Sequence, residues 1–279
     1  MKRFVVLIAL TVICGCASVP NSASRILTYE QYARIEHDTP YVLEFRVGNG
    51  ALLLYGVRHT FDPADAQIAD IRREWARFRP TLAFNEGGNP PTASSISETV
   101  QRVGEVGLVR LLAGADHVPV ATFEPLRAAE REALLENYSP EQVKVFLALR
   151  SFITFRRSKS EESAVEFMNR VLGDRDGLRT VPYTTDELAA SYARLFPGHA
   201  EWQEVPDEWF DPTQAHQYTN RAQSLSGYFR DQHIFRVLVD RVRRGDRVFV
   251  VVGASHVPVL EPALVAALGP PHHKRSGGL

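Results

Sequence analysis

Cysteine is scarce in this sequence, which has only Cys14 and Cys16, both close to the first residue. No thiol follows position 16. A disulfide, a cysteine nucleophile and a thiolate metal site are therefore excluded from the rest of the chain. A Cys-x-x-Cys-His haem attachment motif is also missing, so any haem would be bound without a covalent link.

An excess of charge of one sign is missing too. The 279 residues include 32 Lys and Arg against 33 Asp and Glu, and 44% of them are hydrophobic, which is ordinary globular composition. Without residues 1–15 the balance is 30 basic against 33 acidic residues, which gives no electrostatic footprint for nucleic acid. Beyond the N-terminal segment no apolar run approaches the length of a membrane helix.

Several catalytic motifs are absent as well. The chain has no Gly-x-x-x-x-Gly-Lys-Ser/Thr loop, no Gly-x-Gly-x-x-Gly and no His-Glu-x-x-His. Ser255 adjoins His256 but lacks the Gly-x-Ser-x-Gly turn of a serine hydrolase. Residues 174–177 begin like a calcium loop, and the remaining ligands of such a loop do not follow.

The first residues have the pattern of a targeting segment. Lys2 and Arg3 precede an apolar run over residues 4–13, which as a helix spans about 15 Å, half of a hydrocarbon core of roughly 30 Å. The run ends in Ile13-Cys14-Gly15-Cys16, which resembles a bacterial lipobox. We expect residues 1–15 to be a lipoprotein signal peptide, with ordinary secretory cleavage nearby as the alternative.

On this interpretation Cys16 is acylated and anchors the protein in a lipid bilayer. Ala17 stands where an aspartate would retain a lipoprotein in the inner membrane. We therefore predict a bacterial envelope lipoprotein of the outer membrane that faces the periplasm. Residues 16–27 are expected to be a tether, and residues 269–279 a disordered tail.

Between the expected tether and the expected tail, segments with strand patterns alternate with segments with helix patterns. We predict strands over residues 41–47, 51–55, 81–85, 118–123 and 247–252 and helices over 63–78, 96–114 and 226–245, with several more helices from 126 to 232. The last four strands are almost continuously apolar, as in strands covered on both faces. This order predicts one α/β domain over residues 28–268, with a mainly parallel central sheet flanked by helices and a helical insertion over 126–225.

Polar side chains follow four of the predicted strands. Gly56-Val57-Arg58-His59 and Gly253-Ala254-Ser255-His256 share the spacing Gly-x-x-His, and Glu86 and Glu124 follow the two strands between them. In open parallel sheets, ligands bind beyond the carboxyl ends of the strands. We therefore expect these groups to form one site, whereas Asp116 and His117 precede a strand and are expected to be structural at the opposite edge.

Two imidazoles and one carboxylate are a common ligand set for Zn²⁺, Mn²⁺, Co²⁺ or Fe²⁺. Such a metal lowers the pKa of bound water and polarises a carbonyl. Without metal, the same groups serve as a general base and its orienting partner. The alternative for each residue is a local role, such as a capping histidine or a glutamate in an ion pair.

These motifs, together with the block from Arg230 to Leu264, resemble the TraB/GumN/Tiki group within the wider erythromycin esterase/ChaN-like superfamily. The resemblance covers residues 50–125 and 226–268, and the helical middle has no match. It implies a compact α/β core and, from the Tiki-type members, a metal-dependent protease.

On that pattern, His59, Glu86 and His256 carry the catalytic and metal-binding roles, and Arg230 holds an acidic neighbour or an oxyanion. Glu124 and Asp231 are expected to support these four from a second layer. The chain departs from the esterase branch, which has a glutamate where Val57 and Arg58 stand.

Three functions therefore remain open. The first is a metal-dependent hydrolase that acts on a peptide or a small-molecule ester. The second is a haem-binding lipoprotein of the ChaN type, with Tyr55, His59 or His256 as an axial ligand. The third is a scaffold without catalysis that presents its surface to an envelope partner.

Overall fold

The structure is a computed structural model that describes residues 22–87, 91–157, 161–173, 178, 180–199 and 201–279. The predicted leader, the predicted acylation site Cys16 and the calcium-like residues 174–177 lie outside these ranges. In the part of the chain that is described, no helix has both the length and the apolar character needed to cross a membrane.

Six strands of the described residues form one sheet in the order β4-β3-β5-β2-β1-β6. Their bounds are β1 Tyr41–Val47, β2 Gly50–Val57, β3 Leu82–Asn85, β4 Val120–Thr122, β5 Arg247–Gly253 and β6 His273–Ser276. The neighbours β4, β3, β5 and β2 run parallel, whereas β1 is antiparallel to both β2 and β6. The predicted α/β fold with a mainly parallel sheet is confirmed.

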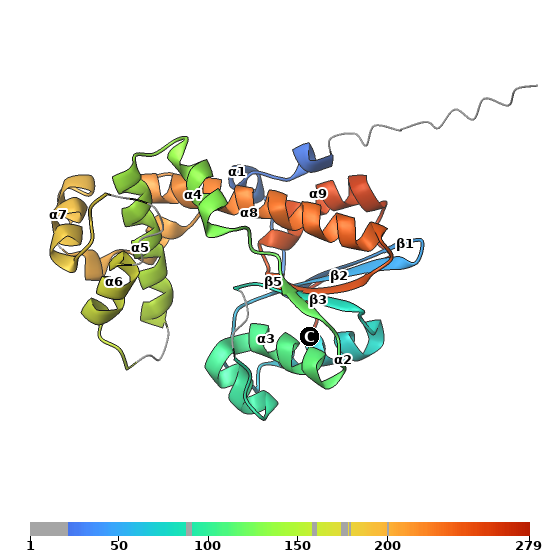
Figure 1. Cartoon of the computed structure of the whole chain (residues 1–279). Coiled ribbons are helices and arrows are strands. Elements are labelled where there is room, and N and C mark those ends of the chain that lie inside the picture. The colour runs from blue at the N-terminus through green and yellow to red at the C-terminus, as the bar shows by residue number, and fades with distance from the viewer. Residues whose placement is uncertain (1–21, 88–90, 158–160, 174–177, 179, 200) are drawn as a thin grey trace, which may run out of the picture.

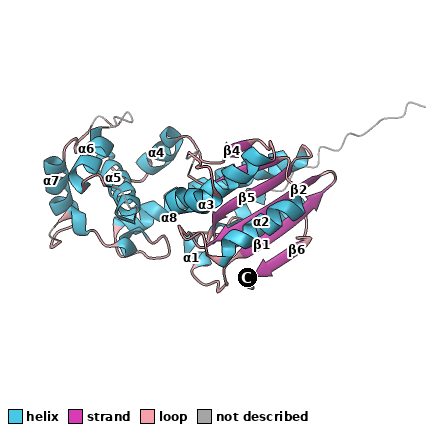
Figure 2. Ribbon diagram, turned by 90° about the horizontal axis from the view of Figure 1, so that it is seen from below, coloured by secondary structure: helices cyan, strands magenta, loops and turns pink. Residues whose placement is uncertain are grey.

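Helices cover both faces of the sheet (Figures 1 and 2). One face packs on α8 (Tyr218–Arg243) and α9 (His256–Leu268), and the other packs on α2 (Ala66–Phe78) and α3 (Ile96–Ala115). All eight residues of β2 are buried, and its side chains alternate between the two cores because successive strand residues point to opposite faces. The predicted burial is therefore present in β2, β3 and β5, whereas the residues of β4, at the edge of the sheet, are partly buried or exposed.

The helical insertion forms a separate body beside the sheet (Figure 1). It contains α4 (Arg127–Leu135), α5 (Pro140–Arg157), α6 (Ala164–Gly173), α7 (Thr185–Leu195), η2 (Trp202–Glu204) and η3 (Asp207–Phe210). Its apolar cluster includes Trp202 and Trp209, which anchor the loops before α8. The first turns of α8 pack on this insertion through Ala222, and its later turns pack on the sheet. This helix therefore connects the two bodies.

Some predicted boundaries are wrong. The long helix begins at Tyr218, eight positions before the predicted start at 226, so position 225 lies inside α8. The helix predicted over residues 63–78 begins at Ala66, because Asp62 accepts a hydrogen bond from the Ala64 N–H in a separate turn and the N-cap is Asp65.

Both ends of the described chain are more ordered than the sequence suggests. The tail, expected to be disordered, forms β6 and pairs with β1 through four register positions. Part of the expected tether forms η1 (Ser22–Arg25), and Ile26 is buried in the core beneath α9. The helix α1 (Tyr29–Tyr32) follows, and a capping box at Thr28 stabilises its N-terminus.

Candidate functional site

The carboxyl ends of four parallel strands meet at one edge of the sheet. Val57 at the end of β2 pairs in register with Gly253 at the end of β5, and Asn85 of β3 pairs with Thr122 of β4. The loop after β5 is tied to β2 by a hydrogen bond from the Ala254 N–H to the Val57 carbonyl at 2.9 Å. The residues that follow these strands are therefore brought together from four distant parts of the sequence.

The first Gly-x-x-His loop is fixed by a side chain of α2. Gln67 is buried, and its amide group bonds to both backbone groups of Arg58, at 2.9 Å from the N–H and 3.1 Å from the carbonyl. This double contact sets the direction of the chain just before His59. The imidazole of His59 lies at the surface of the site and is 58% exposed.

A buried carboxylate of α3 holds this imidazole. Glu105 is 3% exposed, and its Oε1 lies 2.6 Å from His59 Nδ1, while its Oε2 accepts the Thr60 N–H at 3.1 Å. Just before it, Gly104 has a φ of 68° and breaks the helical path of α3. This left-handed conformation suits glycine and places Glu105 under the loop of His59.

The second imidazole has an equivalent partner. His256 stands at the first position of α9, is buried, and approaches Asp231 of α8 with its Nδ1 2.5 Å from Oδ1. Asp231 is fully buried, and its Oδ2 accepts a hydrogen bond from the Tyr29 hydroxyl at 3.1 Å. Each histidine thus belongs to a carboxylate–imidazole dyad that leaves its Nε2 atom for another partner.

Glu86 lies between the two dyads. Its Oε2 is 3.9 Å from His59 Nε2, and its Oε1 is 3.7 Å from His256 Nε2. Its Oε2 also accepts the Gly253 N–H at 2.9 Å. The structure therefore brings His59, Glu86 and His256 into one cluster, as the strand-end pattern predicts.

Arg230 closes the cluster from α8. It donates to Glu86 at 3.1 Å and to both oxygens of Glu124 at 2.8 and 3.0 Å. Glu124 also accepts the Gly87 N–H at 3.2 Å. The two-pronged contact fixes the guanidinium plane, so Arg230 is held beside Glu86 and contributes one positive charge there.

The charges at the site stabilise one another. Burial alone raises the pKa of Glu86, but His256, Arg230 and His59 together hold it well below its usual range. Burial alone lowers the pKa of His256, but Asp231 and Glu86 outweigh it and raise the pKa to about 10. The hydrogen bond that His59 donates to the Glu105 carboxylate raises the pKa of His59. Without a bound metal, a carboxylate at Glu86 therefore faces an imidazolium at His256 at neutral pH.

Gly253 is required by the close approach of His59 and Glu86. A Cβ atom at this position would lie 3.1 Å from His59 Nε2 and 3.7 Å from Glu86 Oε2. Any side chain here would enter the space between the two groups. The first residue of the second Gly-x-x-His motif thus keeps that space open.

The ligand atoms are close to the spacing that one metal ion requires. Two ligands at about 2.1 Å from a tetrahedral ion lie about 3.4 Å apart, a few tenths of an ångström less than the separations of Glu86 from the two Nε2 atoms. Among the described residues, no group of three or more His, Cys, Asp or Glu side chains is placed so that it could hold a metal ion. The types of donor suit such an ion, although their present spacing is wider than it requires, because each Nδ1 is held by a carboxylate and each Nε2 faces Glu86.

Two residues of the site carry no signal in the strand-end pattern. Glu105 lies inside a helix and Tyr29 lies 202 positions before its partner Asp231. Glu105 had a detectable feature, since it is an acid beside a glycine in the otherwise apolar run Val103–Val109. Tyr29 had none, because its contact depends on how α1 packs against α8.

Other residues singled out in the sequence lie away from the site. Tyr55 is fully buried, and its hydroxyl donates to Asp70 of α2 at 2.5 Å, on the opposite face of the sheet from α9. Asp116 accepts the indole N–H of Trp75 at 2.7 Å, a structural role at the far end of the sheet. His117 has a φ of 56° and forms the turn before β4.

The chain matches no protein-family model, no curated protein and no solved structure.

Proposed function

We propose that this protein is a metal-dependent hydrolase of ester or peptide bonds, with its site at His59, Glu86 and His256. One observation carries the proposal: two carboxylate–imidazole dyads direct their Nε2 atoms at opposite oxygens of a single glutamate, at 3.9 and 3.7 Å. A metal ligand histidine commonly has its other nitrogen bound to a carboxylate in this way.

The protein groups have distinct tasks in this proposal. Glu105 and Asp231 keep a proton on each Nδ1, which leaves the Nε2 lone pairs of His59 and His256 to bind a metal or accept a proton. A divalent metal held there would supply an activated water and polarise the substrate carbonyl. Glu86 completes the ligand set, and Arg230 beside it stabilises the negative charge that develops on the substrate oxygen.

The free-energy cost of burying the charged side chains of this cluster favours a functional role for them. Glu86 and Arg230 have side chains less than one fifth exposed, and charged groups in such positions are costly to desolvate. A protein that needed only stability would gain at least as much from apolar packing at the strand ends. The two dyads and the arginine instead arrange five charged side chains around Glu86, which is the pattern of a reactive site. The resemblance of these motifs to the TraB/GumN/Tiki group supports the same assignment.

The experiment compares hydrolysis and metal binding in matched variants. Purified protein is freed of metal with a chelator, then supplied with Zn²⁺, Mn²⁺, Co²⁺ or Fe²⁺, and tested on chromogenic esters and a peptide library. We expect turnover with at least one metal, and a loss of about 100-fold or more in His59→Ala and His256→Ala. His273→Ala is the control, since His273 lies in β6 at the opposite edge strand of the sheet.

Unchanged turnover in both site variants would reject the proposal. Turnover that persists without metal and still requires His59 would reject a role for a metal ion and would indicate that the imidazole acts as a general base. The absence of both metal binding and turnover would favour the scaffold function. A titration with haemin tests the remaining alternative, in which His59 or His256 binds the iron, and we expect no Soret shift.

We also propose that the protein is an outer-membrane lipoprotein facing the periplasm, anchored through acylated Cys16. The support is the lipobox-like sequence before Cys16, Ile13-Cys14-Gly15-Cys16. Labelling of cells with a radioactive fatty acid should mark the wild-type protein and leave Cys16→Ser unmarked. Equal labelling of both proteins would contradict this assignment.

A further inference from the structure

The two edges of the sheet differ in how they are protected. Among the described residues, β6 forms one edge and β4 the other, as Figure 2 shows. The sequence of β6 is His273-Lys274-Arg275-Ser276, and charged side chains on an edge strand hinder the pairing of a further strand. The sequence of β4 is Val120-Ala121-Thr122, which carries no charge. The edge at β4 therefore lacks this protection.

The backbone of β4 directs hydrogen-bonding groups away from the sheet. Ala83 of β3 pairs with Val120, and its N–H donates to the Pro119 carbonyl at 2.9 Å. Because alternate residues of a strand bond to the same neighbour, Ala121 also faces β3, whereas Val120 and Thr122 turn their N–H and C=O groups outward. In the described chain, no hydrogen bond from another element reaches these outward groups. They match the pattern that an added strand requires.

Two prolines limit the free edge to a short segment. Pro119 precedes β4 and Pro125 follows it, and proline has no N–H to donate. Between them, Thr122 is exposed and the other two residues of β4 are partly buried. This edge therefore suits a short extended segment, and it is too short for the long pairing of two sheets.

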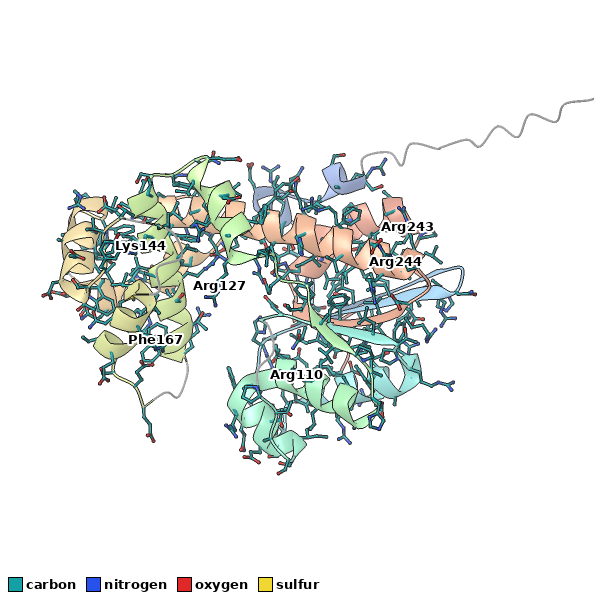
Figure 3. The ribbon with its side chains drawn as sticks, viewed as in Figure 1. Arg110, Arg127, Lys144, Phe167, Arg243 and Arg244 are labelled. Carbon is teal, nitrogen blue, oxygen red and sulfur yellow. The ribbon has the colours of Figure 1, made fainter. Side chains whose placement is uncertain are left out.

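A cavity of about 900 Å³ adjoins the end of β4. Thr122 and Leu126 belong to its lining, and Leu126 is 80% exposed. The helical insertion contributes apolar side chains that include Leu147 and Phe167, and Figure 3 labels Phe167 on α6. Side chains of an extended segment point alternately to its two faces, so a segment paired with β4 would present every second side chain to this cavity.

The charged side chains of the cavity are engaged within the protein. The two acids of the lining, Glu124 and Glu130, are each paired with an arginine of the same lining. The basic residues of the lining also have partners in the protein, and they are Arg127, Lys144, Arg150, Arg170 and Arg230. A neutral side chain therefore suits this cavity better than a charged one.

The strand leads from its free edge to the candidate site. Glu124 follows the end of β4 by two positions and is held by Arg230, which also donates to Glu86 at 3.1 Å. Neighbouring strands lie about 4.8 Å apart, so an added strand would lie about 10 Å from β3, which ends next to Glu86. About three extended residues, at roughly 3.3 Å each, cover that distance.

We propose that the free edge of β4 is a docking site that takes a neutral, extended polypeptide segment as an added strand beside the cluster of His59, Glu86 and His256. The inference rests on the proposed hydrolase function and adds how a substrate would be held. The outward groups of Val120 and Thr122 bind the backbone of the segment. The cavity receives one of its side chains, and the bond to be cleaved lies about three or four residues further along the segment.

The test is a binding measurement that needs no turnover. The probes are the dansyl-labelled peptide amide Ser-Val-Thr-Val-Ser and the same peptide with every backbone nitrogen methylated, followed by fluorescence anisotropy on the metal-free protein. Methylation removes the backbone donors and keeps the side chains. We expect the unmethylated peptide to bind at least about tenfold more tightly, because an added strand is held by its backbone hydrogen bonds.

Two variants at one position locate the binding to β4. Thr122→Val and Thr122→Pro both lose the hydroxyl that accepts the Glu124 N–H at 3.1 Å, and only Thr122→Pro also loses the outward N–H. Proline is tolerated in an edge strand where its nitrogen faces outward. We expect Thr122→Pro to bind the unmethylated peptide about three- to tenfold more weakly than Thr122→Val, and both variants to bind the methylated peptide equally.

Equal binding of the two peptides to the wild-type protein would overturn the inference, and this comparison remains decisive if Thr122→Pro does not fold. Equal affinities of folded Thr122→Pro and Thr122→Val for the unmethylated peptide would also overturn it, since the peptide would then pair elsewhere. Ester turnover without a preference for the unmethylated peptide rejects the docking site and retains the hydrolase. Selective binding at β4 without turnover of any peptide or ester retains the docking site and rejects the hydrolase.

Discussion

Replacing Gly253 by alanine should block the candidate site without unfolding the protein. The added methyl group would lie 3.1 Å from His59 Nε2, closer than the usual contact of about 3.5 Å, and 3.7 Å from Glu86 Oε2. The backbone accepts alanine because Gly253 is not among the glycines with a positive φ. His59 is 58% exposed, so its ring can move outward by the few tenths of an ångström required.

The consequences for stability and for function therefore differ in size. We expect a change in the free energy of unfolding of about 1 kcal/mol or less, measured by urea denaturation. Zinc affinity and turnover should each fall by about 10- to 100-fold, because the methyl group separates the first imidazole from Glu86. Gly114→Ala is the control, since a Cβ there meets nothing within 4 Å. Full zinc affinity and turnover in Gly253→Ala would refute the proposed position of the site.

Three other predictions follow from the same contacts. Burial alone lowers the pKa of His256, but its carboxylate partners raise it from 6.5 to about 10. The metal-free protein should therefore have the full stabilisation below pH 6.5 and lose up to about 4 to 5 kcal/mol of it as the pH rises from 6.5 through 10. A flat profile of urea midpoints over this pH range would contradict this prediction. Glu105→Gln removes the main cause of the raised pKa of His59, so NMR titration should give a lower pKa for His59 in this variant. Turnover should fall about 10- to 100-fold. An unchanged titration curve would show that Glu105 does not hold the imidazole ring. Gly227→Ala places a Cβ 2.6 Å from the buried ring of Tyr29 and should destabilise the protein by about 1 to 3 kcal/mol in thermal or urea unfolding. No change in stability would mean that α1 does not pack on α8 as described.

The sequence was sufficient to predict the sheet and the meeting of the strand-end residues. Short runs rich in valine, such as residues 248–252, favour a buried parallel strand, and the carboxyl ends of such strands share one edge. Glu86 and the two Gly-x-x-His histidines could therefore be placed together before any coordinates, although their roles remain proposals.

The supporting contacts could not be predicted as easily. Glu105 reaches His59 because the chain reverses its local geometry at Gly104, and a helical pattern in the sequence does not reveal that break. The β6 strand was missed because His273–Ser276 is polar and lacks strand periodicity, and its pairing depends on the open edge that β1 offers. Such features arise from tertiary packing and backbone hydrogen bonds more than from local propensity.

A zinc-soaked crystal, measured at the zinc absorption edge, would show whether a metal ion binds at His59, Glu86 and His256. We expect one anomalous peak about 2.1 Å from Nε2 of His59, Nε2 of His256 and one oxygen of Glu86, with Arg230 keeping its contacts to Glu124 and moved away from Glu86. A peak bound elsewhere, or none at this cluster under saturating zinc, would contradict a metal-dependent site at these three residues.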